Sequence, residues 1–121
     1  MTERQHLIKD CDDLLRDIVR IRDNWTCQKS RSREGVQVAH FFSRKDLTTR
    51  WDLDNVCLLN AGVHKFWAHV KHEEFRDWWI SRIGLVRFDA LRMRNRCRGP
   101  VTTDSIRMTK MWLRQTLEEM K

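Results

Sequence analysis

Three histidines and one asparagine are the residues of this chain whose types and spacing could support catalysis. His40, Asn55, His64 and His69 follow one another within a short stretch that is rich in arginine and tryptophan. A neutral imidazole can accept a proton near pH 7 and can bind a metal ion. The order histidine, asparagine, histidine therefore suits metal-assisted cleavage of a phosphodiester. Few other features of the sequence point to chemistry.

A strand, a loop and a helix are needed to bring these residues together. The segment Val36–Phe42 alternates loosely and is β-branched or aromatic, which predicts a strand that places His40 at the edge of a cleft. A helix that begins near Gly62 would present His64 to the same cleft, and its N-terminal N–H groups favour a phosphate. The loop between them carries three cations that could contact backbone phosphates: Arg44, Lys45 and Arg50.

The rest of the chain is predicted to form helices joined by polar segments. Apolar residues recur at helical spacing from Gln5 to Trp25, and the short apolar run Asn55–Leu59 predicts the second strand of a hairpin. The pattern is helical from Ala61 onward, and Gly84 is placed to end a helix over Glu73–Ile83. Two further helices are predicted, one over Val86–Met93 and a last one capped by Thr103 or Asp104.

The composition limits the class of partner and the compartment. The 121 residues suffice for one domain with one modest core. The net charge of +7 favours an anionic partner, most often nucleic acid, over a surface that is merely basic. Because 17 acidic residues accompany 24 basic ones, we expect a folded, charge-rich surface. With no secretory signal and no run of roughly 18 apolar residues, we expect a soluble, cytoplasmic protein with no membrane partner.

The four cysteines are scattered along the chain, at Cys11, Cys27, Cys57 and Cys97. They form no Cys-x-x-Cys pair, which is the spacing that zinc sites usually use. In a cytoplasmic protein we expect four free thiols and no disulfide framework.

Four stretches carry a more specific signal through their content and spacing: Ile18–Asp23, Ala39–Arg44, Thr49–Asn55 and His64–His69. Together they resemble the small phage-type HNH endonucleases of the ββα-metal class, over more than half of the chain. The spacing from Ser43 through Asn55 to His64 is the most specific part of this resemblance. The tail after Gly84 is less distinctive.

The resemblance implies an α+β fold that is mainly helical, with a short two-stranded β-hairpin and a helix forming a ββα-metal core. It implies a single domain over residues 1–121, made of an N-terminal helix (1–25), the HNH core (26–84) and a C-terminal helical extension (85–121). The partner it implies is DNA, cleaved to 5′-phosphate and 3′-hydroxyl ends in a bacterial or phage-infected host cell. The high tryptophan content is compatible with a homodimer.

The same resemblance implies a role for each site residue. His40 matches the general base that takes a proton from the attacking water, and Asn55 matches the residue that holds the metal loop and orients that base. His64 matches a ligand of a divalent metal ion, for which Mg²⁺ or Mn²⁺ is expected. Asp52 and Asp54 are alternative oxygen ligands, or they cap turns and pair with Arg50.

His69 is a second candidate metal ligand, with a geometric condition attached. It lies five positions after His64, which is a turn of about 140° on a regular helix. The residue on the same face, four positions on, is Ala68. His69 is therefore a ligand only if the helix is irregular at this point.

Two departures from the family pattern leave alternatives open. Ala39 stands where many members have an acidic residue or histidine as a further metal ligand. The structural zinc positions are occupied by Cys27, Ser30, Asn60 and Val63, so no structural zinc is expected. A non-catalytic DNA-binding module on a decayed HNH scaffold, or a protein-interaction module, is the alternative to the nuclease.

Overall fold

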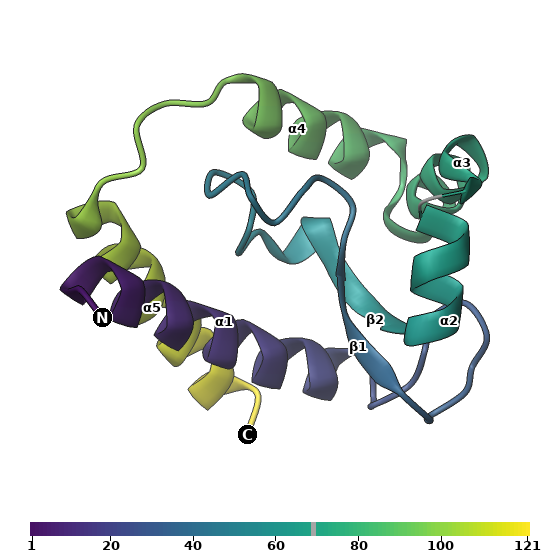
Figure 1. Ribbon diagram of the computed structural model, residues 1–121, viewed down its shortest axis with the longest axis horizontal. Helices are drawn as coiled ribbons and strands as arrows, with labels where there is room; N and C mark the ends of the chain where they lie inside the picture. The colour runs from purple at the N-terminus through teal and green to yellow at the C-terminus, as the bar shows by residue number, and fades with distance from the viewer. Residues whose placement is uncertain (69) are drawn as a thin grey trace.

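A two-stranded antiparallel hairpin lies between two groups of helices in the computed structural model (Figure 1). The structure describes residues 1–68 and 70–121. Helices α1 (Glu3–Arg22) and α5 (Thr103–Glu119) lie on one side of the hairpin, and α3 (His72–Ile83) and α4 (Leu85–Arg96) lie on the other. The short elements are β1 (Val36–His40), η1 (Leu53–Asn55), β2 (Val56–Asn60), α2 (Ala61–Val63) and the π-helical turn η2 (His64–Ala68). The expected α+β class, mainly helical with one hairpin, is confirmed.

Helix α1 begins with a capping box and ends three residues earlier than its periodicity predicts. Oγ1 of Thr2 accepts the N–H of Gln5, and the Gln5 side chain accepts the N–H of Thr2. Beyond the helix the backbone becomes left-handed, with φ of 53° at both Asn24 and Trp25. Trp25 is consequently half exposed, with the guanidinium of Arg20 4.6 Å from its ring centroid.

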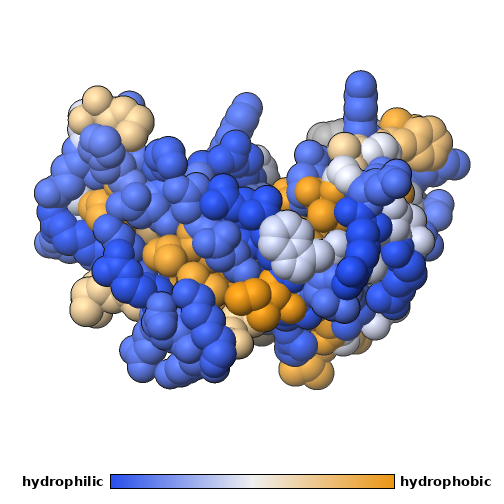
Figure 2. Space-filling view, turned by 90° about the horizontal axis from the view of Figure 1, so that it is seen from below, coloured by the Kyte–Doolittle hydropathy of each residue, from blue (hydrophilic) through white to orange (hydrophobic). Residues whose placement is uncertain are grey.

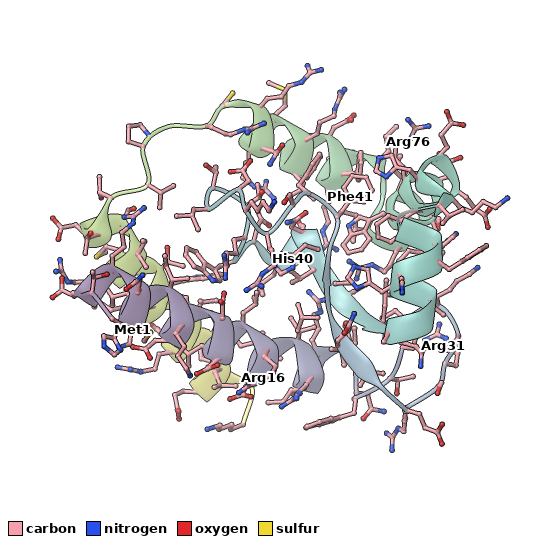
Figure 3. All side chains as sticks on the ribbon, viewed as in Figure 1. Met1, Arg16, Arg31, His40, Phe41 and Arg76 are labelled. Atoms are coloured by element: carbon pink, nitrogen blue, oxygen red, sulfur yellow. The ribbon has the colours of Figure 1, made fainter. Side chains whose placement is uncertain are left out.

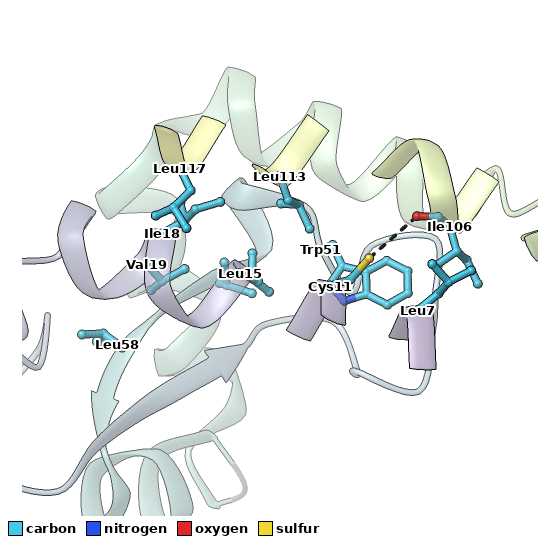
Figure 4. Close-up of a cluster of buried hydrophobic side chains, with 11 residues drawn as sticks. Leu7, Cys11, Leu15, Ile18, Val19, Trp51, Leu58, Ile106, Leu113 and Leu117 are labelled. Atoms are coloured by element: carbon cyan, nitrogen blue, oxygen red, sulfur yellow. Dashed lines mark hydrogen bonds between the residues drawn. The ribbon is translucent and has the colours of Figure 1, made fainter. Parts of the chain in front are cut away.

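The first hydrophobic core joins α1 and α5 to one face of the hairpin (Figure 4). Its buried side chains from the two helices are Leu7, Cys11, Leu15, Ile18, Val19, Ile106, Leu113 and Leu117. Helix α5 is capped by Thr102, whose Oγ1 accepts the N–H of Ser105 at 3.0 Å. The predicted caps Thr103 and Asp104 are therefore wrong, because both residues lie inside the first turn.

The hairpin separates this core from a second one. In β1, Val36 and Val38 contact the first core, whereas Ala39 is buried in the second, as expected for alternating strand residues. The register pairs Val36 with Asn60 and His40 with Val56. Strand β2 begins one residue later than predicted, because Leu53–Asn55 forms a 3₁₀ turn instead.

The second core is rich in aromatic rings from η2, α3, α4 and Phe41, the residue that follows β1. Phe41 packs against Phe75, Trp79 and Phe88, with ring centroids 5.2–5.5 Å apart. Gly84 ends α3 with a φ of 89°, which confirms the predicted helix stop. Helix α4 runs beyond both ends of the predicted Val86–Met93 segment.

The surface is charge-rich, as the composition predicts. Figure 2 shows hydrophilic side chains over most of the face seen from below, with apolar groups in separate patches. Among the described residues, no helix has the length and apolar character needed to cross a membrane.

Candidate active site

His40 ends β1 with its side chain on the face that packs against α1 (Figure 3). The half-buried ring lines a hollow of about 390 Å³ between α1 and β1. Its Nε2 lies 2.9 Å from the carbonyl oxygen of Arg50. A carbonyl oxygen can only accept a hydrogen bond, so in the neutral ring Nε2 carries the proton and Nδ1 keeps the lone pair.

The surroundings of His40 favour this neutral ring. Burial lowers the pKa of His40 below its ordinary value of 6.5. The Arg50 carbonyl opposes this change, and the positive charges of Arg44 and Arg50 reinforce it. At pH 7 the ring is therefore a base with one available nitrogen, Nδ1.

Asn55 is fully buried and holds the loop that follows His40. Its Oδ1 accepts the N–H of Phe42 at 2.8 Å, and its Nδ2 donates to the carbonyl oxygens of Phe42 and Thr49 at 3.1 and 3.0 Å. These bonds tie the start of the loop to its end. The Arg50 carbonyl, next to Thr49, is thereby fixed against the His40 ring. This geometry agrees with the positioning role expected for Asn55.

Asp12, on α1, anchors the same loop from the other side. Its carboxylate accepts hydrogen bonds from Arg50 Nε and Nη2 at 2.9 and 2.6 Å and from Trp51 Nε1 at 2.9 Å. Burial alone would raise the pKa of Asp12, but the bonds from Arg50 and Trp51 lower it overall. Sequence reasoning missed this residue, because nothing in the periodicity of α1 distinguishes it from the neighbouring acids.

The three loop cations predicted to contact DNA divide into two kinds. Arg50 is 14% exposed and is committed to Asp12. Arg44 is 62% exposed, although it also reaches Asp12 at 3.3 Å, and Lys45 is exposed. Arg44 and Lys45 are thus the two that face solvent, while Arg50 stabilises the loop.

His64 lies on the opposite side of the hairpin from His40. Its Nδ1 is 2.8 Å from Nε2 of Gln37, and Gln37 is three residues before His40 on β1, so strand alternation directs their side chains to opposite faces. The structure therefore brings His40, Asn55 and the loop cations together and gives His64 a separate set of contacts. This differs from the expectation that both rings share one cleft.

The helix is irregular from His64 onward. An irregular helix is what His69 would need in order to bind a metal ion together with His64. Residues His64–Ala68 form a π-helical turn, in which hydrogen bonds join residues five apart. His69 itself lies outside the described residues, so its role as a ligand stays a prediction.

The described residues offer few donors for a metal ion. Within 1–68 and 70–121, no group of three His, Cys, Asp or Glu residues is placed to hold one. Asp52 accepts the N–H of Asp54 and pairs with Arg94 at 2.7 Å, and Asp54 pairs with Arg87. Asp52 caps a turn as expected, and in the described part of the chain the ion-pair partners of the two aspartates are Arg94 and Arg87 instead of Arg50.

The four positions that the resemblance matches to zinc ligands lie in two turns, and each turn is closed by a side-chain acceptor. Sγ of Cys27 accepts the N–H of Ser30 at 3.3 Å. Burial raises the pKa of this thiol, but the polar groups of Ser30 and the backbone of Asn60 and Lys29 lower it below its ordinary value. Oδ1 of Asn60 accepts the N–H groups of Gly62 and Val63 at 2.9 and 3.4 Å. A thiol sulfur and an amide oxygen thus each close one of the two turns.

Comparisons with known proteins do not assign the chain to a family. No protein-family model, curated protein or solved structure matches it.

Proposed function

We propose that this protein is a metal-dependent DNA endonuclease of the HNH type. The observation that carries the proposal is the His40 ring, whose Nε2–H is fixed on the Arg50 carbonyl while Nδ1 is left as the base. Asn55 supports that arrangement from a fully buried position with three hydrogen bonds. A buried histidine with a defined tautomer and a lowered pKa, lining a hollow, is the arrangement that general-base catalysis requires.

In this proposal each residue has a defined task. His40 Nδ1 takes a proton from the water that attacks the scissile phosphate, and the Arg50 carbonyl stabilises the ring as it becomes positive. Arg44 and Lys45 hold flanking phosphates. A divalent cation, when bound, supplies positive charge beside the phosphate. The residue that the resemblance assigns to hold it is His64, whose Nδ1 lies 2.8 Å from the Gln37 side-chain amide.

Cleavage of supercoiled plasmid in Mg²⁺ or Mn²⁺ tests the proposal. His40→Ala should lower the cleavage rate by about 10²–10⁴-fold, because it removes the general base. His6→Ala, which removes an exposed histidine of α1, is the matched control and should cut at the wild-type rate. Cutting that survives in His40→Ala would remove this mechanism.

The pH dependence of cleavage follows from the pKa of His40. Because burial lowers that pKa, the base stays deprotonated below pH 6.5, and the acid limb of the rate profile should have its midpoint below that value. Beneath the midpoint the rate should fall about tenfold per pH unit. An acid limb centred above pH 6.5 in single-turnover cleavage would contradict the neutral, buried ring.

One observation favours a second candidate, a non-catalytic DNA-binding protein on the same scaffold. His64 is hydrogen-bonded to Gln37, whose side chain alternates to the face of β1 opposite to that of His40, and this separates the base from the expected metal ligand. This candidate predicts salt-sensitive DNA binding with no cleavage in either cation. The plasmid assay, run beside a binding titration, separates the two functions.

A further inference from the structure

A second hollow, of about 460 Å³, lies beside the loop that follows His40. Three separate parts of the chain line it: the first turn of α1, the loop 42–48, and the segment 95–101 that leads from α4 towards α5. Each part contributes one cation: Arg4, Lys45 and Arg98. Residues distant in sequence thus present positive charge to one concave surface.

The charges of this hollow are unevenly balanced. Within the described residues, no ion pair or side-chain hydrogen bond involves the Arg4 guanidinium or the Lys45 ammonium group. The carboxylate in the lining, Asp46, already pairs with Arg98 at 3.1 Å and accepts a hydrogen bond from Asn95 at 2.7 Å. Two cations therefore face the hollow without a carboxylate of their own, and an anion would complete it.

Residues that line this second hollow lie near the candidate active-site residue His40 in the sequence. Ser43 lines it, whereas His40 lines the other hollow, on the α1–β1 side. Three residues of extended chain span about 10 Å, so the two hollows are close enough for one strand of nucleic acid to reach both. Helix α1 lines both hollows, through Arg4 in one and Arg16 in the other.

We propose that this second hollow binds a backbone phosphate of DNA a few nucleotides from the phosphate at His40. The proposal rests on the proposed function, because it takes DNA as the ligand. It adds Arg4 and Arg98 to the DNA-binding surface, and it assigns Lys45 to this hollow. The contact is to phosphate, so it should position the strand without reading its sequence.

The test is the salt dependence of DNA binding, measured by anisotropy of a labelled duplex between about 50 and 200 mM salt. Arg4→Gln/Lys45→Gln should weaken binding roughly tenfold at the low-salt end and reduce the slope of log K against log salt by about 1.8. Adding Arg98→Gln should weaken binding further. The matched control, Arg114→Gln/Lys121→Gln, removes the same charge from α5 and the residues that follow it. Arg114 shares a hollow with Asp10, Asp13 and Asp17, and this variant should keep the wild-type slope.

The outcomes separate this inference from the proposed function. The phosphate-binding role of the hollow would be contradicted by a wild-type slope in the Arg4/Lys45 variant, or by an equal reduction of the slope in the Arg114/Lys121 control, even if the wild-type protein cuts DNA. A reduced slope in a protein that does not cut DNA would support this role and contradict the proposed endonuclease function. Absence of DNA binding at low salt would also contradict the phosphate-binding role. A thermal unfolding midpoint equal to that of the Arg114/Lys121 control shows that each variant is folded.

Discussion

Replacement of Asp12 by alanine should destabilise the protein by about 3–5 kcal/mol, because it leaves a largely buried guanidinium without its counter-ion. Arg50 is 14% exposed and donates two hydrogen bonds to Asp12. The indole N–H of Trp51, a residue only 5% exposed, would lose its acceptor as well. The measurement is the free energy of unfolding from urea titration monitored by tryptophan fluorescence.

Asp13→Ala is the matched control for Asp12→Ala. Asp13 is 40% exposed and pairs with Lys9 and Arg16 on the helix surface, so its loss should cost less than about 1 kcal/mol. The pH dependence gives a second check. Because the pKa of folded Asp12 is lowered from 3.8, its contribution is present above about pH 4 and is lost as the pH falls further. Equal costs for the two variants would contradict the anchoring role of Asp12.

The parts of the structure that sequence reasoning predicts well are those set by local patterns. The strand around Val36, the apolar segment that becomes β2 and the helix stop at Gly84 all follow from residue alternation or from a single special residue. The predicted ends of the strands are less accurate, because side chains compete with the partner strand for backbone hydrogen bonds. The N–H of Phe42, predicted to belong to a strand, donates to Oδ1 of Asn55 instead.

The contacts that sequence reasoning misses join residues far apart in the chain. Asp12 and Arg50 are separated by 38 residues, and nothing local in either segment indicates that α1 crosses the loop. The charge of Arg50 predicts a DNA contact, but charge alone does not distinguish an exposed cation from one in an internal ion pair.

The order of the elements along the chain predicts that His40 and His64 face one cleft. That order does not determine to which face of the strand each side chain points. A strand end and a helix start can be close while their side chains point apart, since strand residues alternate faces. Gln37 is the β1 residue whose side chain hydrogen-bonds to His64, and the alternation of faces along the strand then directs the His40 ring away from that contact.

The two turns that contain the positions matched to zinc ligands differ from this case, because each is closed by a local hydrogen bond. Sγ of Cys27 accepts the N–H of Ser30, and Oδ1 of Asn60 accepts the N–H groups of Gly62 and Val63. A metal thiolate can accept the same hydrogen bonds. The N–H of Gln28 donates to the carbonyl oxygen of Leu58, two residues before Asn60, which brings the two turns close together.

The triple variant Ser30→Cys/Asn60→Cys/Val63→Cys should therefore bind one zinc ion with an apparent free energy of about 10–16 kcal/mol. In chelator it should be about 1 kcal/mol less stable than the wild type, because the Asn60 cap is lost. With free zinc at about a thousand times the dissociation constant, it should gain about 4 kcal/mol. Zinc content by atomic absorption and thermal unfolding with and without zinc measure both effects.

The matched control is the same triple variant with Cys27→Ser, which keeps three of the four thiolates. Removing one ligand should lower zinc affinity by at least tenfold. If the two turns were not adjacent, the zinc affinity of the triple variant would not depend on Cys27. Tight zinc binding by the triple variant would mean that the scaffold still holds four zinc ligands in tetrahedral reach. Stoichiometric zinc without added stability would mean that binding distorts the turns, contrary to the geometry around Cys27 and Asn60.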